Sequence, residues 1–146
     1  MNLTILSHLI QESYGRYAKR VIRCLKRWPN EALPFGDDCP LKNCWEVVIF
    51  VQRTQEPLDW EVWEDSIRDC CHGFVERMSL QEQTLLWLGT DDSMAYDGTA
   101  VPHGEPVEEA ITAKIYDCVI SEANNCIIPK RLQNYIDEDG VREVDA

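Results

Sequence analysis

A helical period runs without a break through the first 28 residues of the chain, and it constrains the fold more than any other feature. Apolar residues recur there at steps of three and four, which places them on one face of an α-helix: Leu6, Leu9, Ile10, Tyr14, Tyr17, Val21, Leu25 and Trp28. Asn2 or Thr4 can cap the start, and Pro29 disfavours a helical conformation in the residue before it. We therefore expect a helix from about residue 2 to residue 28.

The second half of this helix concentrates positive charge. The stretch RYAKRVIRCLKR holds six bases and no acid: Arg16, Lys19, Arg20, Arg23, Lys26 and Arg27. Since successive residues of a helix are rotated by about 100°, the six bases fall on the side opposite the apolar stripe. We therefore expect one solvent-exposed basic face.

Residues 44–52 fit either of two secondary structures. The run is β-branched or aromatic from Val47 to Val51, which is typical of a buried strand. Asn43, three residues before Glu46, instead resembles a helix cap. We favour a helix because no nearby segment offers a clear strand partner. The alternative, with residues 44–52 as a strand, would make the fold α+β.

Three further segments carry helical signals. Pro57 suits the first position of one helix, Ser79 and Glu82 form a capping box ahead of a second, and Pro106 opens a third. We expect these helices over residues 56–78, 80–88 and 107–125. A short helical turn is expected within residues 128–136.

These segments together predict an all-α fold, a single-domain bundle of about five amphipathic helices over residues 1–136. Residues 89–106 contain several Gly and Pro breakers, so we expect a long loop there, and a loop of that length is either functional or simply mobile. Residues 137–146 are acidic and pack poorly, so we expect a flexible tail.

The chain is expected to be soluble. Of its 146 residues 45% are hydrophobic, enough to bury a core. No apolar run approaches the ~20 residues needed to span a bilayer. The first residues lack the basic start and the cleavage site of a signal peptide. We therefore expect a cytoplasmic protein that does not bind a membrane.

Cysteine is the residue type that raises the question of a metal site or a catalytic thiol. The chain has seven cysteines, but no CxxC pair, and Cys71 and His72 are adjacent on a helix and so point to different sides. The stretch from Asp91 to Pro102 departs from a calcium-binding loop at Ala95 and at its twelfth position. We expect reduced, buried thiols, no metal, no cofactor and no catalytic residue.

Charge is divided unevenly along the chain, whose net charge is −12. Residues 1–53 hold eight bases and five acids, a net charge of +3, whereas residues 54–146 hold six bases and 21 acids, a net charge of −15. A surface of this acidity accelerates encounter with a basic molecule. We expect a basic protein partner to bind at Glu61, Glu64, Asp65, Asp91 and Asp92.

These features favour a non-enzymatic binding protein of the immunity or antitoxin type, an inhibitor that neutralises a basic toxin such as a nuclease. One alternative is a nucleic-acid or nucleoprotein-associated factor that uses the basic face, although the acidic remainder would repel a polyanion. Others are a phage-type mimic of DNA, an enzyme with residues 89–106 as a lid, and an acidic surface that only keeps the protein soluble.

Overall fold

Every regular element that the computed structural model describes is an α-helix. It describes residues 3–29, 41–54, 60–95, 104–134 and 136. The named helices are α1 (Leu3–Arg27), α2 (Cys44–Thr54), α3 (Trp60–Glu76), α4 (Leu80–Trp87), α5 (Asp91–Ala95) and α6 (Glu105–Asn125). Residues 130–134 and 136 are also helical. The all-α prediction is confirmed. The alternative strand over residues 44–52 is wrong, because these residues lie in α2.

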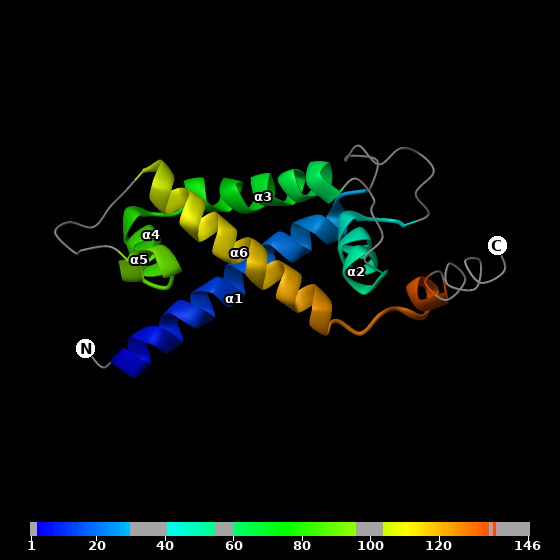
Figure 1. Ribbon diagram of the computed structural model, residues 1–146, viewed down its shortest axis with the longest axis horizontal. Coiled ribbons are helices and arrows are strands. Elements are labelled where there is room, and N and C mark those ends of the chain that lie inside the picture. The colour runs from blue at the N-terminus through cyan, green and yellow to red at the C-terminus, as the bar shows by residue number, and fades with distance from the viewer. Residues whose placement is uncertain (1–2, 30–40, 55–59, 96–103, 135, 137–146) are drawn as a thin grey trace.

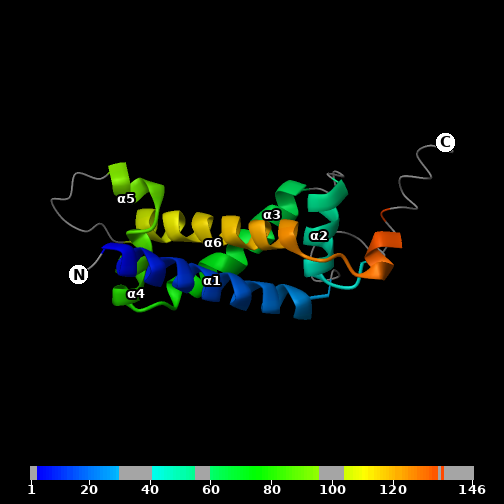
Figure 2. The same ribbon diagram turned by 90° about the horizontal axis from the view of Figure 1, so that it is seen from below.

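Helix α6 is the central element. It packs against α1, α2, α3 and α4. Helices α1 and α6 cross at the middle of the molecule, and both run from the end that holds α4 and α5 towards the end that holds α2 (Figure 1). Seen from below, they lie one over the other along the long axis (Figure 2). Helices α1, α3 and α6 each keep exposed residues on the side that points away from these contacts.

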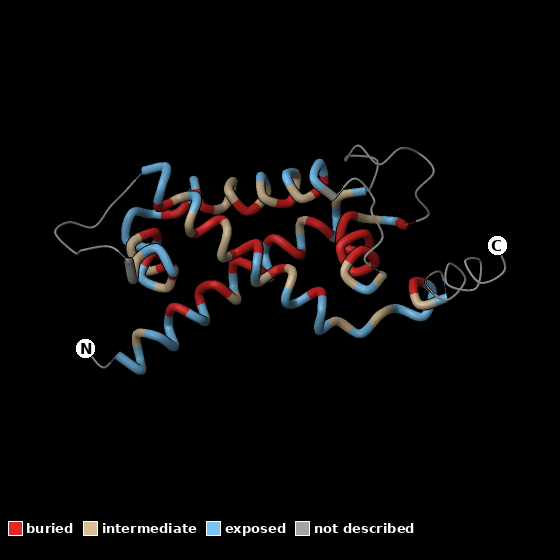
Figure 3. The backbone as a smooth tube through the Cα atoms, in the orientation of Figure 1, coloured by how far each residue is buried: buried red, intermediate tan, exposed pale blue. Residues whose placement is uncertain are grey.

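The predicted apolar stripe of α1 forms the core from Ile10 onwards. Tyr14, Tyr17, Val21 and Leu25 on this stripe are all buried. The stripe is not covered at its start, where Leu9 is 44% exposed, because the first turns of α1 project beyond the other helices (Figure 3). Leu9 thus belongs to the predicted stripe but not to the core.

Helix α2 is buried on all sides, which explains why its sequence has no helical period. Every residue from Cys44 to Val51 is buried, and α2 contacts both α1 and α6. A side-chain cap fixes where the helix begins, because the Asn43 side-chain carbonyl accepts a hydrogen bond from the Glu46 N–H at 2.9 Å. Burial and capping thus outweigh the strand preference of the β-branched run.

Helix α4 begins at the predicted cap and ends in a close contact with α1. The Ser79 hydroxyl accepts a hydrogen bond from the Glu82 N–H at 3.1 Å. Beyond the helix, a Cβ on Gly89 would collide with Ile10 Cγ2 and lie 3.1 Å from Tyr14 Cε2. The absence of a side chain at Gly89 thus allows this chain segment to approach α1. A hydrogen bond links the same two segments, since the Tyr14 hydroxyl donates to the Leu86 carbonyl at 2.6 Å.

The expectation of an uninterrupted loop over residues 89–106 is wrong. Helix α5 lies within it, and the Thr90 hydroxyl caps α5 by accepting from the Ser93 N–H at 3.3 Å. Gly104, with φ of 84°, precedes α6, and Pro106 lies in the first turn as predicted. The predicted starts of two helices, at residues 2 and 56–59, and the predicted tail at 137–146 lie outside the described residues.

Candidate functional site

Three carboxylates form a row along the solvent face of α3. Glu61, Asp65 and Asp69 are all exposed, and their four-residue spacing places them on one helix face with a rise of about 6 Å between neighbours. We call them the α3 acidic row. Within the described residues, no ion pair engages them. The predicted set omitted Asp69, although its spacing from Asp65 could be read from the sequence.

Glu64 lies on another side of α3 and serves the contact with α6. Its carboxylate is half-buried and forms an ion pair with Arg68 at 3.1 Å. The Arg68 guanidinium in turn stacks over the ring of Tyr116 on α6, 4.2 Å from the ring centroid. Burial first, and then the nearby Glu64 carboxylate, raise the pKa of the Tyr116 hydroxyl. Glu64 thus belongs to the junction between the helices rather than to the α3 acidic row.

The five acids predicted to bind a partner do not form one patch. Glu61, Glu64 and Asp65 lie in the first two turns of α3, which begin near α2, whereas Asp91 and Asp92 open α5 at the opposite end of the molecule (Figure 1). Both residues of the second group are exposed. They line a groove between α1 and α6.

This groove consists of two adjoining hollows. The larger has a volume of about 550 Å³ and the smaller about 290 Å³, and they share Lys19, Ile22 and Glu122. The larger hollow reaches Asp91 and Asp92, and the smaller one is walled by Trp45 of α2. We call the two together the α1–α6 groove. It could not be read from the sequence, because it depends on how α1 and α6 cross.

The basic face of α1 is confirmed as a solvent-exposed surface. All six bases are exposed: Arg16, Lys19, Arg20, Arg23, Lys26 and Arg27. Arg16 donates to the Ser13 hydroxyl at 3.0 Å, and the Arg20 guanidinium lies 5.0 Å from the centroid of the Tyr17 ring. Among the residues that the structure describes, none of the six pairs with a carboxylate. The carboxylates on α3 are thus not neutralised by α1.

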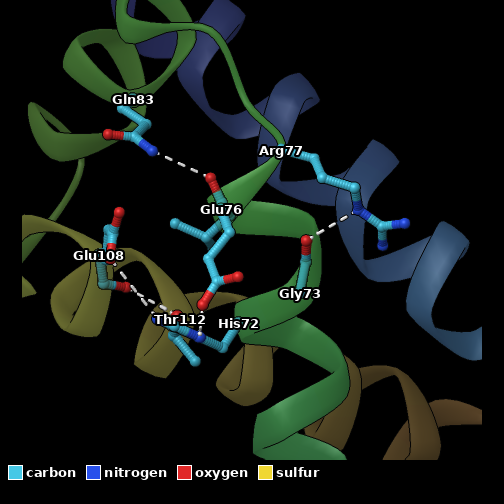
Figure 4. Close-up of polar contacts among 8 residues, drawn as sticks. His72, Gly73, Glu76, Arg77, Gln83, Glu108 and Thr112 are labelled. Carbon is cyan, nitrogen blue, oxygen red and sulfur yellow. Dashed lines mark hydrogen bonds and ion pairs between the residues drawn. The ribbon is translucent and has the colours of Figure 1, made fainter.

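The adjacent Cys71 and His72 point to different environments, as their spacing predicts. Cys71 is fully buried, and burial raises the pKa of its thiol to about 12, so it stays protonated at neutral pH. His72 reaches two carboxylates (Figure 4), with Nδ1 2.9 Å from Glu76 and Nε2 3.6 Å from Glu108 on α6. This arrangement joins α3 to α6 and does not pair a nucleophile with a base.

Two further cysteines, Cys44 and Cys70, are also poor ligands and nucleophiles. Burial raises the pKa of Cys44 to about 11 and that of Cys70 to about 12. Over the described ranges, no three or more His, Cys, Asp or Glu side chains are arranged to hold a metal ion. Cys39 lies outside those ranges.

In the part of the chain that the structure describes, no helix is both long enough and apolar enough to cross a membrane. No protein-family model, no curated protein and no solved structure matches this chain.

Proposed function

We propose that this protein is a non-enzymatic cytoplasmic inhibitor of the immunity or antitoxin type, which binds and neutralises a basic toxin. The α3 acidic row carries the proposal. Its three carboxylates are exposed, lie on one helix face and, within the described residues, have no cationic partner. A nuclease is a suitable target because its active site is built to hold phosphate, and a row of carboxylates can occupy that site in its place.

The charge of the surrounding chain supports the same function. The α3 acidic row belongs to residues 54–146, whose net charge is −15, and this field would draw a basic protein towards α3. The side chain of Val62, 45% exposed, lies beside Glu61 and offers an apolar contact at the start of the row. The carboxylates would speed the encounter with a basic protein, and the apolar side chain of Val62 would add buried area to the complex.

A pull-down from the native cells tests the proposal. At low ionic strength the protein should recover a basic partner, and the variant Glu61→Gln/Asp65→Asn should recover several-fold less. Glu105→Gln/Glu109→Gln is the matched control, because it removes two negative charges from exposed positions on α6. Like Glu61 in α3, Glu105 lies in the first turn of its helix, so both variants lose one acid that favours the helix start. Recovery of no protein partner, or equal losses in both variants, would refute the proposed site.

A second function has one observation in its favour. The six bases on α1 are exposed and, where the structure describes the chain, unpaired with carboxylates, which is the electrostatic footprint of a phosphate-binding surface. We propose nucleic-acid binding as the runner-up. A gel shift with duplex DNA or RNA that disappears in Arg20→Gln/Arg23→Gln would place it above inhibition. Absence of any shift at low salt would eliminate it.

A further inference from the structure

The α1–α6 groove is lined by small residues that repeat with helical spacing. On α1 they are Gly15 and Ala18, and on α6 they are Ala110 and Ala113. A Cβ added at Gly15 would meet no atom within 4 Å, so the groove is open above this position. Small side chains on two neighbouring helices leave a trough into which the ridge of a third helix can pack.

The length of the groove sets the size of what it can hold. Its α6 wall runs from Ala110 to Glu122. Twelve helical steps rise about 18 Å, which equals about three turns of a second helix laid alongside. The groove is bounded near Thr90 at one end and by Trp45 at the other. A helical segment of about three turns therefore fits.

One end of the groove is acidic. Asp91 and Asp92 are exposed and line it there, whereas Asp117 lines the middle of the α6 wall. Lys114 also lines this end, but its ammonium donates to the Gly89 carbonyl and lies 5.3 Å from the centroid of the Tyr14 ring. The ammonium is thus already engaged, and the carboxylates dominate this end.

The other end of the groove is basic. Arg23 and Lys26 line only the smaller hollow, whereas Lys19 and Glu122 line both hollows and lie where the two meet. The dipole of an α-helix places partial positive charge at its N-terminus and partial negative charge at its C-terminus. A helix in this groove therefore lies most favourably with its N-terminus at the acidic end and its C-terminus at the basic end.

We infer that the α1–α6 groove receives an α-helix of about three turns from the basic partner. The N-terminus of that helix faces Asp91 and Asp92, and its C-terminus faces Arg23 and Lys26, so it runs in the same direction as α1 and α6. This inference rests on the proposed function, since the helix belongs to the protein that the α3 acidic row attracts.

The test measures binding of the basic protein recovered in the pull-down to two glycine variants. Gly15→Leu fills the groove, and it should lower affinity by about 30-fold or more, as loss of a central interface contact does. Gly15→Ala is the matched control, because it adds only a Cβ, which meets no atom within 4 Å and leaves the groove open. Its affinity should equal that of the wild type.

A charge variant keeps the inference testable if Gly15→Leu does not fold, as checked by circular dichroism. Arg23→Glu/Lys26→Glu adds negative charge, so general attraction of a basic partner predicts tighter binding. A helix C-terminus seated at this end instead predicts weaker binding, by about tenfold. Tighter binding, or wild-type affinity of a folded Gly15→Leu, overturns the groove inference and leaves the proposed function standing. Failure of the wild type to bind any protein overturns both.

Discussion

Gly89→Ala is the substitution whose effect follows most directly from the packing of the described helices. The added methyl group would collide with Ile10 Cγ2 and lie 3.1 Å from Tyr14 Cε2. Both neighbours are buried in α1, and the Tyr14 hydroxyl is tied to the Leu86 carbonyl at 2.6 Å, so neither can move away easily. Overpacking of this kind costs about 2 kcal/mol. For a chain of this length that lowers the melting temperature by about 6 °C.

Gly15→Ala is the matched control and should act in the opposite direction. Gly15 lies inside α1, where an added Cβ meets no atom within 4 Å. Replacing a glycine within a helix by alanine should stabilise the protein by about 0.5–1 kcal/mol. Thermal and urea unfolding followed by circular dichroism measure both variants. If Gly89→Ala were neutral or stabilising, the close approach of this segment to α1 would be wrong.

Three further predictions concern caps, ion pairs and thiols. Ser79→Ala should cost about 1 kcal/mol in urea unfolding, because the hydroxyl caps α4; no loss would mean that the cap is unimportant. Arg131→Ala should cost about 1 kcal/mol, since it leaves the buried Glu46 carboxylate without its cation; a neutral effect would refute that pairing. Cys70 and Cys71, whose pKa values are raised to about 12 by burial, should stay protonated at pH 8 and react slowly with a disulfide reagent until urea unfolds the protein; fast modification of either residue in the native protein, located by mass spectrometry, would contradict these raised pKa values.

Much of the fold was predictable because its signals are local. The stripe of α1, the Ser79 cap and the proline that opens α6 each depend on residues within a few positions of one another. Helix α5 has a local signal too, a threonine cap followed by two acids, but the surrounding Gly and Pro residues obscured it. The exposure of Leu9 on the first turns of α1 could not be predicted, because a periodic stripe does not reveal where the neighbouring helices end.

The candidate site was predictable only in part, because it depends on distance across the molecule. Asp91 and Asp92 follow α3 closely in sequence, but α3 and α4 carry the chain away from Glu61 before α5 begins (Figure 1). Glu64 is drawn into the contact between α3 and α6 because its ion-pair partner Arg68 stacks on Tyr116, and this requires α6 to lie beside α3. The α1–α6 groove likewise arises from the crossing of two helices far apart in sequence, which no local pattern encodes.

The central claim is that the α3 acidic row meets a basic protein through charge, and the salt dependence of the association rate tests it most directly. With the recovered partner, stopped-flow mixing should show an association rate that falls by about tenfold or more as salt rises from roughly 0.02 to 0.2 M. Glu61→Gln/Asp65→Asn should associate several-fold more slowly at low salt and show a weaker salt dependence. An association rate that is insensitive to salt and unchanged in the variant would contradict the claim.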